Sequence, residues 1–306
     1  MCVGFWCLEH PRYALIMCSN RDEYLSRPTS EAHFHSFESS GTTDPEGGLV
    51  LSGRDLLAGG TWAGIGRTGR IAFLTNITES PKTYNSSRGD LTSSFLLHRF
   101  PGRTLEDEVH AIVSRNGVFA GFNLLLSTPL YTPDADGKRT LSLEAAFVTN
   151  SGGAGTITAR HLSDEERRCG GMSNGIDRHG ASEWTKVKHG TRSMQDVLDS
   201  ITEDTTESEI VEHLFGILTW KCNPSPLDRS ELRNTIQVEP LVVASPDSAH
   251  CEYYGTRLST VILIGRNGSV LFVERDVWAL DAEGRPVRAD AEKQRVFRFQ
   301  IEECPP

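Results

Sequence analysis

The sequence lacks three features that mark familiar classes of protein. No apolar run approaches the roughly 20 residues that a membrane-spanning helix requires, so we expect no transmembrane segment. Positive charge is not in excess, because 31 Lys and Arg stand against 41 Asp and Glu. The resulting net charge of -10 makes nucleic acid and anionic membranes poor partners. The seven cysteines form no CxxC pair and no regular spacing, which argues against a disulfide framework and a zinc site.

The first residues also do not resemble a secretory signal peptide. No basic segment opens the chain, and Glu9, His10 and Arg12 interrupt the apolar stretch. We therefore expect a cytoplasmic protein. Its 306 residues are enough to bury roughly 75% of the surface of the unfolded chain, so no cofactor is required for folding. No internal repeat or long linker divides the sequence, which predicts a single domain over residues 1–306.

Apolar runs at both ends of the chain predict β-hairpins. The runs Cys2–Leu8 and Tyr13–Cys18 flank a polar turn and are apolar on both faces, so this hairpin is expected inside the protein. Residues Ser259–Glu274 form a second hairpin around a Gly265–Gly268 turn. Helical spacing lies between these ends, at Leu91–Phe100, after Thr104, and at Ser182–Lys188, Ser193–Ile201 and Ser208–Leu218. The pattern predicts an α+β fold with mostly antiparallel sheets and outer helices.

Three short motifs have an ordinary structural explanation. Gly64–Gly69 matches G-x-G-x-x-G, but the strand-like run Arg70–Thr75 follows it, so we predict a hairpin turn and no dinucleotide site. His33 and His35 lack a third ligand at a recognisable spacing, which favours surface histidines over a metal site. Asp134–Gly137 begins like a calcium loop without the Glu at the twelfth position, so a turn is sufficient. No metal site is predicted.

Cys2 is the residue with the clearest chemical potential. One interpretation is a small buried side chain in the first strand. The other follows from its position, because methionine aminopeptidases remove Met before small residues. Cys2 would then carry a free α-amine with an unperturbed pKa of about 7.7–8.0. That amine can take the proton of the thiol in the same residue, which is the N-terminal form of an activated nucleophile.

A polar cluster at the end of the second run would lie beside Cys2. Ser19-Asn20-Arg21-Asp22-Glu23 directly follows the buried run, and pairing of the two strands brings its end next to Cys2. A solvated hairpin end is one explanation of these residues. The other is functional, because a cation and a carboxylate are suitable neighbours for a thiolate and an ammonium group.

These residues resemble the family that is named for its Asn-Arg-Asp-Glu motif. The resemblance starts at Met1-Cys2, continues through Asn20–Glu23 and Arg27-Pro28, and covers nearly the whole chain. Further segments agree with the family, namely Gly59–Gly64, Leu74–Asn76, Gly121–Leu124, Ser173–Gly175, Trp184 and Tyr254–Arg257. Residues 36–48 and 131–140 look like insertions relative to it.

That family in turn looks like the N-terminal-nucleophile hydrolases of the bile-salt and penicillin-V acylase type. The resemblance implies their four-layer αββα sandwich, with a Cys at the start of the mature chain and Asn residues in the oxyanion hole. Carried over to this sequence, the nucleophile is Cys2 and the carboxylate is Asp22. The oxyanion donors are Asn174 and Asn76, and the arginine of a late strand is Arg257.

The early arginine of the acylases has two alternatives in this chain. The acylases separate that Arg from the Asp by two residues, whereas Arg21 and Asp22 are adjacent. Adjacent residues of a strand point to opposite faces. Either a bulge brings both side chains inward, or Asn20 takes the place of the arginine.

Two functional hypotheses follow. The first is a hydrolase that attacks an amide or acyl-CoA-type thioester through Cys2. The second is a non-catalytic carrier of haem or acyl-CoA, with Cys2, Cys7 or a loop His as a haem ligand. The family resemblance implies roles in haem mobilisation, lipid homeostasis and Golgi or secretory organisation, with association with the Golgi or mitochondria. A purely structural secretory factor is a third hypothesis. Retention of Met1 in the mature protein would argue against the hydrolase.

Overall fold

The computed structural model describes residues 2–37, 47–80, 82–98, 100, 102–115, 117–133, 139–244, 251–290 and 292–302. The chain divides into two compact units. The first comprises Met1–Arg27, Asp164–Ile264 and Val270–Arg298, and the second comprises Pro28–Ser163, Gly265–Ser269 and Phe299–Pro306. The predicted turn at Asp134–Gly137 and most of the segment 36–48 lie outside the described residues.

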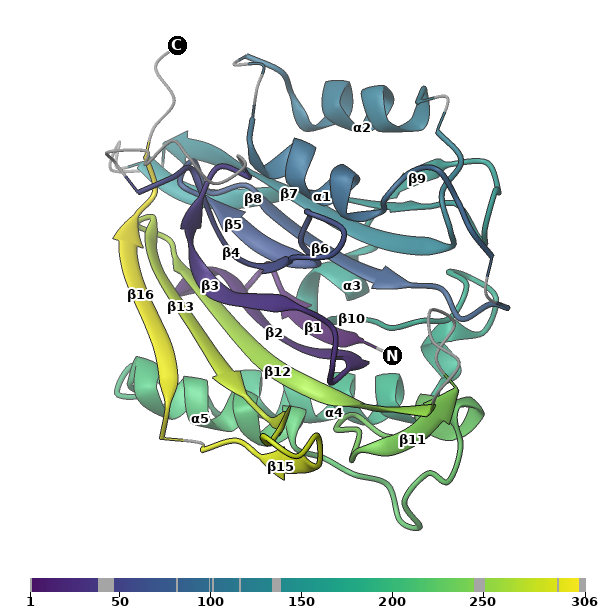
Figure 1. Cartoon of the computed structure of the whole chain (residues 1–306). Coiled ribbons are helices and arrows are strands. Elements are labelled where there is room, and N and C mark those ends of the chain that lie inside the picture. Colours follow the sequence, from purple (N-terminus) through teal and green to yellow (C-terminus); the bar gives the residue numbers. More distant parts are fainter. Residues whose placement is uncertain are drawn as a thin grey trace. The chain divides into compact units, whose positions relative to one another are not determined.

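A seven-stranded sheet forms the centre of the first unit (Figure 1), in the order β10-β1-β2-β12-β13-β16 with β11 paired to β12. Its strands are β1 (Val3–Cys7), β2 (Tyr13–Tyr24), β10 (Gly170–Met172), β11 (Leu241–Ala244), β12 (Cys251–Gly265), β13 (Ser269–Asp276) and β16 (Gln294–Gln300). Both predicted hairpins are confirmed, since β1 pairs antiparallel with β2 and β12 pairs antiparallel with β13. The first hairpin is buried on both faces, as its apolar runs predict.

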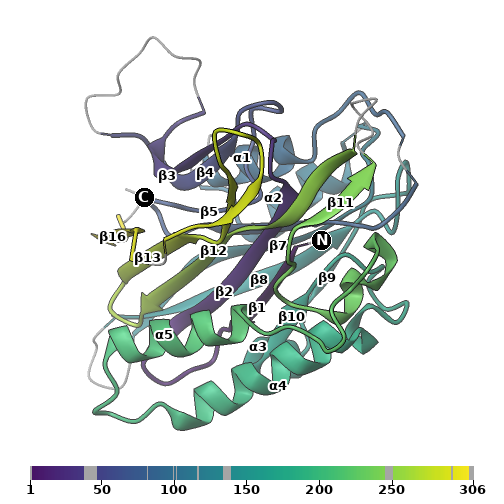
Figure 2. The ribbon, with the colours of Figure 1, turned by 60° about the horizontal axis from the view of Figure 1, so that its bottom comes forward.

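Helices cover one face of this first sheet (Figure 2). Their buried side chains pack with those of the strands to form the hydrophobic core of the unit. The helical elements of the unit are α3 (Asp164–Arg168), η1 (Ala181–Glu183), α4 (Thr185–Ser200), α5 (Glu207–Leu218) and η2 (Arg229–Asn234). A small hairpin joins β14 (Trp278–Leu280) and β15 (Pro286–Arg288). Buried side chains of α4 and α5 pack against alternate residues of the strands, including Val3, Phe5 and Val261.

The prediction of two helices over residues 182–201 is wrong, because α4 is continuous through Gly190. Glycine usually weakens a helix interior by about 1 kcal/mol. Here a Cβ atom at Gly190 would lie 1.9 Å from Cζ of Phe5. Glycine is therefore the residue that lets this helix approach the sheet. The start of α5 follows its sequence closely, because Thr206 and Glu209 form a capping box.

The second unit also consists of a sheet and two helices. Its strands run in the order β3-β4-β5-β6-β7-β8-β9, and each pairs antiparallel with the next. They are β3 (Thr29–His35), β4 (Val50–Asp55), β5 (Ala63–Gly66), β6 (Ile71–Asn76), β7 (Phe122–Pro133), β8 (Arg139–Thr149) and β9 (Thr158–His161). The helices α1 (Gly89–Leu96) and α2 (Leu105–Val113) bury Leu91, Phe95 and Ile112 against this sheet. Thr104 caps α2, as predicted.

The glycine-rich segment is a hairpin turn, as predicted. Gly69 has a φ of +82° and lies between β5 and β6, where Gly69 N donates to the carbonyl of Gly66. No helix starts there, and Asn76 ends β6 opposite Phe122. The segment therefore lacks the strand–turn–helix arrangement of a dinucleotide site.

The predicted α+β class with mostly antiparallel sheets is confirmed. Each unit supplies one sheet and one layer of helices, which are the components of an αββα sandwich. The single domain over 1–306 stays a prediction. Within the described residues, no helix has the length and apolar character needed to cross a membrane.

Candidate active site

Cys2 lies directly before β1 and is nearly buried, with 9% of its surface exposed. Its Sγ is 3.8 Å from the carbonyl oxygen of Asp22, to which it donates. Burial raises the pKa of the Cys2 thiol, and the Asp22 charge raises it further. The charge of the N-terminal amino group, the hydrogen bond to the Asp22 carbonyl and the Arg21 charge lower this pKa. The thiol is therefore protonated at neutral pH, and its use as a nucleophile requires a base.

Asp22 is held through both its main chain and its side chain. Its Oδ1 accepts a hydrogen bond of 2.6 Å from Oγ1 of Thr256 on β12, and its carbonyl accepts one of 2.9 Å from the Tyr254 hydroxyl. Thr256 is itself oriented, because its Oγ1 accepts from the amide of Val238 at 2.8 Å. With 3% of its surface exposed, Asp22 is a buried carboxylate in a fixed orientation.

Asn20 lies on the helix side of the sheet and forms three hydrogen bonds there. Its Nδ2 donates to the carbonyls of Leu218 and Ile236, and its Oδ1 accepts from Ser259 Oγ at 2.6 Å. These bonds join β2, β12 and the end of α5. Asn20 and Asp22 share this face because they are two residues apart on the same strand.

The side chains of Asp22 and Asn20 are both bound to β12. Asp22 accepts from Thr256, and Asn20 accepts from Ser259. Strand β2 itself continues through Arg21 and Asp22 to Tyr24, and its register with β1 is regular up to Asn20. The charge of Arg21 acts on Cys2 and lowers the pKa of its thiol.

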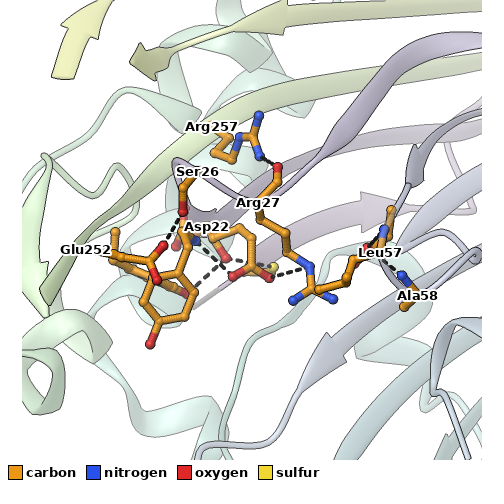
Figure 3. Close-up of polar contacts among 12 residues, drawn as sticks. Asp22, Ser26, Arg27, Leu57, Ala58, Glu252 and Arg257 are labelled. Atoms are coloured by element: carbon orange, nitrogen blue, oxygen red, sulfur yellow. Dashed lines mark hydrogen bonds and ion pairs between the residues drawn. The ribbon is translucent and has the colours of Figure 1, made fainter. Parts of the chain in front are cut away.

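Arg257 follows Thr256 on β12 and reaches the end of β2. Its guanidinium donates to the carbonyl of Arg27, as Figure 3 shows. Nearby, Arg27 Nε lies 3.9 Å from a carboxylate oxygen of Glu23, and Ser26 donates to Glu252. Arg257, one of these charged groups, thus directly follows Thr256, whose hydroxyl binds the Asp22 side chain.

Asn174 is linked to Cys2 through its neighbour in the chain. Strand β10 pairs with β1 and ends at Met172, which lies opposite Gly4. Directly after it, Ser173 Oγ donates to the Cys2 carbonyl at 2.8 Å and also lies 3.2 Å from Asn174 Oδ1. The structure therefore brings Cys2, Asp22 and Asn174 together in the first unit. Asn76 belongs to the second unit.

Three residues of this site were not predicted from the sequence: Thr256, Ser173 and Lys186. Lys186 lies in the first turn of α4 with 0% of its surface exposed. Burial lowers its pKa to about 8, while the charges of Asp22 and Cys2 act in the opposite direction. A lysine is usually exposed, so no feature of the sequence indicates this placement. Within the described part of the chain, no three His, Cys, Asp or Glu side chains cluster closely enough to hold a metal ion.

Two solved structures are similar to this chain over most of their length. The Caenorhabditis elegans ortholog of N-acylethanolamine-hydrolyzing acid amidase has 12% sequence identity and a TM-score of 0.47, covering 85% of this chain and 92% of that one. A mutant of conjugated bile acid hydrolase from Clostridium perfringens has 8% identity and a TM-score of 0.49, covering 99% and 98%.

Relatives with higher identity include two animal proteins. The mouse Transport and Golgi organization 2 homolog is 26% identical over 288 residues, covering 90% of this chain and 93% of the mouse protein. Transport and Golgi organization protein 2 of Drosophila melanogaster is 27% identical over 314 residues, covering 96% and 98%. A family model described as Transport and Golgi organisation 2 matches residues 1–279. This chain therefore belongs to the Transport and Golgi organisation 2 family.

Proposed function

We propose that this chain is an N-terminal-nucleophile-type hydrolase that cleaves an amide or acyl-CoA-type thioester through Cys2. The observation that supports it is the set of groups around the thiol. Sγ contacts the Asp22 carbonyl, the charges of Asp22 and Arg21 act on it, and Asn174 is linked to the same residue through Ser173. A family named for Golgi organisation is compatible with a role of such chemistry in lipid homeostasis, at the Golgi or at mitochondria.

The proposed reaction is acyl transfer to Cys2 followed by hydrolysis. Removal of the preceding residue frees the Cys2 α-amine, which accepts the thiol proton as the sulfur attacks the carbonyl carbon. The amine then returns the proton to the leaving amine or thiol as the carbon–nitrogen or carbon–sulfur bond breaks. Water attacks the acyl-enzyme, gives up a proton to the same amine, and releases the acid and the free thiol.

The neighbouring polar residues have distinct roles in this proposal. Asn174 donates a hydrogen bond to the oxyanion, a contribution worth about 2.7–4 kcal/mol for one donor. Asp22 and Arg257 position the amine and the thiol. Arg21 supplies the early cation, while Asn20 holds β2, β12 and α5 together through its three hydrogen bonds.

A carrier of haem or acyl-CoA is the second function, and the state of the thiol favours it. Burial raises the pKa of Cys2 and the charge of Asp22 acts in the same direction, so the resting group is a neutral thiol. Such a group suits binding as well as reaction. Cys7 lies among core residues under the helices, which leaves Cys2 as the better haem ligand of the two.

The decisive experiment compares the mature protein with a form whose N-terminus is extended by one residue. The extension converts the α-amine into an amide, so hydrolysis of acyl-CoA and N-acyl amide substrates should fall about 10²–10⁴-fold. Cys2→Ala should abolish turnover with the fold intact, and Cys251→Ala, at an exposed cysteine, is the matched control. Mass spectrometry establishes whether Met1 is removed.

Equal turnover and equal ligand affinity in the processed and extended proteins would contradict the N-terminal-nucleophile mechanism. Haem or acyl-CoA binding without turnover in either form would support the carrier. Loss of turnover with unchanged affinity in the extended form would support the hydrolase.

A further inference from the structure

The buried lysine of α4 has no explanation in the stability of its own helix. Lys186 lies in the first turn of α4, where the positive end of the helix dipole disfavours a cation. It is also fully removed from water, which disfavours its charged form again. No acidic residue of the first turn offsets these costs. The compensation must come from outside the helix.

That compensation is provided by the strand that carries Asp22. The Asp22 carboxylate is itself 3% exposed and oriented by Thr256. Trp184, the residue before α4, packs in one cluster with Tyr254, whose hydroxyl donates to the Asp22 carbonyl, so the start of α4 lies close to this strand. Asp22 and Cys2 both act electrostatically on Lys186, in the direction that favours its protonated form. A buried carboxylate and a buried ammonium that attract each other reduce the desolvation cost of both.

The other charged groups on the elements around Lys186 are engaged elsewhere or exposed. Helix α4 packs against β1, β10, α5, η1 and η2, and β10 contains no titratable residue. Some of the remaining groups have a partner other than Lys186: Glu183 pairs with Lys188, Glu207 with Arg298, Glu209 with Thr206, Glu212 with Arg275, Glu231 with Leu227, Arg229 with the Tyr254 ring and His189 with the Trp220 ring. The others are exposed to solvent, namely Arg192, Asp196, Asp199, His213 and Arg233. Asp22 and Cys2 are therefore the charges that matter for Lys186.

We propose that Lys186 is a positioning residue of the Cys2 site, whose ammonium group neutralises Asp22 and stabilises the Cys2 thiolate. This assignment rests on the proposed use of Cys2 as the nucleophile. The carboxylate that orients the site would otherwise oppose formation of a second negative charge beside it. Lys186 removes this conflict, because it lies within electrostatic reach of both groups. The thiol proton still passes to the base, and Lys186 itself stays protonated.

The test measures the reactivity of Cys2 against pH, without any substrate. Iodoacetamide alkylates the thiolate, with formation of a carbon–sulfur bond and release of iodide, and mass spectrometry quantifies the Cys2 peptide. At pH 7, where Lys186 with its pKa of about 8 is protonated, Lys186→Met should slow alkylation of Cys2 about tenfold. Lys186→Arg should keep the wild-type profile. Lys188→Met is the matched control on the exposed side of the same helix and should leave the profile unchanged.

Lys186→Met leaves the buried Asp22 charge uncompensated and can fail to fold. Asp22→Asn and the double variant Asp22→Asn/Lys186→Met avoid that problem, because neither has an unpaired buried carboxylate. At pH 7 the double variant should be alkylated at Cys2 more slowly than Asp22→Asn alone. An unchanged rate at pH 7 in folded Lys186→Met, or equal rates in this second pair, would overturn the role of Lys186 while the hydrolase proposal stands. A shifted profile in a protein that hydrolyses no acyl substrate would retain Lys186 and overturn the hydrolase.

Discussion

At the scale of single residues, Asp22 shows how hydrogen bonds from a neighbouring strand can fix a carboxylate. Its carbonyl accepts from the Cys2 thiol and the Tyr254 hydroxyl, and its side chain accepts from Thr256. The bond from Thr256 is made to the charged carboxylate, and a bond of this kind is worth about 1.5–3 kcal/mol. The same residue thus orients the thiol through its main chain and influences its charge through its side chain.

Part of this site follows from the sequence and part does not. Cys2, Asp22 and Asn174 belong to recognisable motifs, and pairing of two apolar runs predicts that Asp22 lies near Cys2. Lys186 carries no such indication, because its burial depends on a carboxylate 164 positions away in the sequence that no local pattern connects to it. Long-range electrostatic partners of this kind appear only when the fold is known.

His35 provides a residue-scale prediction of pH dependence. Burial lowers its pKa from 6.5 to about 4, and the charges of His33 and Arg54 act in the same direction. Between these pH values the unfolded chain takes up a proton that the folded chain does not. The free energy of unfolding should therefore fall as the pH decreases from 7 to 4.5, by about 2 kcal/mol from this group once residual solvent contact is allowed for.

Urea unfolding at the two pH values measures this effect. His35→Gln is the suitable variant, because Gln retains a polar group for the contact of 2.9 Å with Ser52 Oγ but does not titrate. The wild type should lose about 2 kcal/mol more than His35→Gln on acidification. Equal losses in the two proteins would contradict the prediction.

At the scale of helices, replacing two glycines by alanine should change the stability of the protein in opposite directions. Gly190 of α4 faces the ring of Phe5, and a Cβ there would overlap it at 1.9 Å. Gly190→Ala should therefore destabilise the protein by about 1–3 kcal/mol, although Ala is the better helix former. Gly216 of α5 has no atom within 4 Å of the same position, so Gly216→Ala should stabilise by about 0.5–1 kcal/mol. Chemical denaturation of both variants checks this pair, and a shift in the same direction for both would show that packing against Phe5 is not the cause.

The elements differ in how well the sequence predicts them. Long apolar strands and capped helices such as α2 and α5 are predicted well, because alternation, helical spacing and capping residues are local properties. Strand β3 was not predicted, since Thr29–His35 mixes exposed and buried residues without regular apolar alternation. Short strands of three or four residues, such as β10 and β14, are defined by their partners.

At the scale of the whole molecule, the chain passes repeatedly between its two units. The passages lie between Arg27 and Pro28, Ser163 and Asp164, Ile264 and Gly265, Ser269 and Val270, and Arg298 and Phe299. Strands β12, β13 and β16 each contain one of these passages. Unfolding of one unit would therefore disrupt strands that continue into the other unit.

We accordingly predict a single cooperative unfolding transition. Four of the five tryptophans lie in the first unit and Trp62 lies in the second, whereas far-ultraviolet circular dichroism reports on the strands and helices of both. The midpoints from tryptophan fluorescence and from circular dichroism should coincide in urea. Two separated transitions would contradict both this prediction and the single domain expected from the sequence.

The order of the strands in the first sheet also has a consequence for synthesis of the chain. The hairpin β1–β2 lies between β10 and β12, and its helical cover ends at Leu218. At roughly 5–20 residues per second, the ribosome needs on the order of 10–40 s to proceed from Tyr24 to the end of α5. During that interval, this hairpin, which is apolar on both faces, is not yet covered by α4 and α5. The segment that carries Cys2 and Asp22 is thus a natural client for chaperones that shield nascent chains.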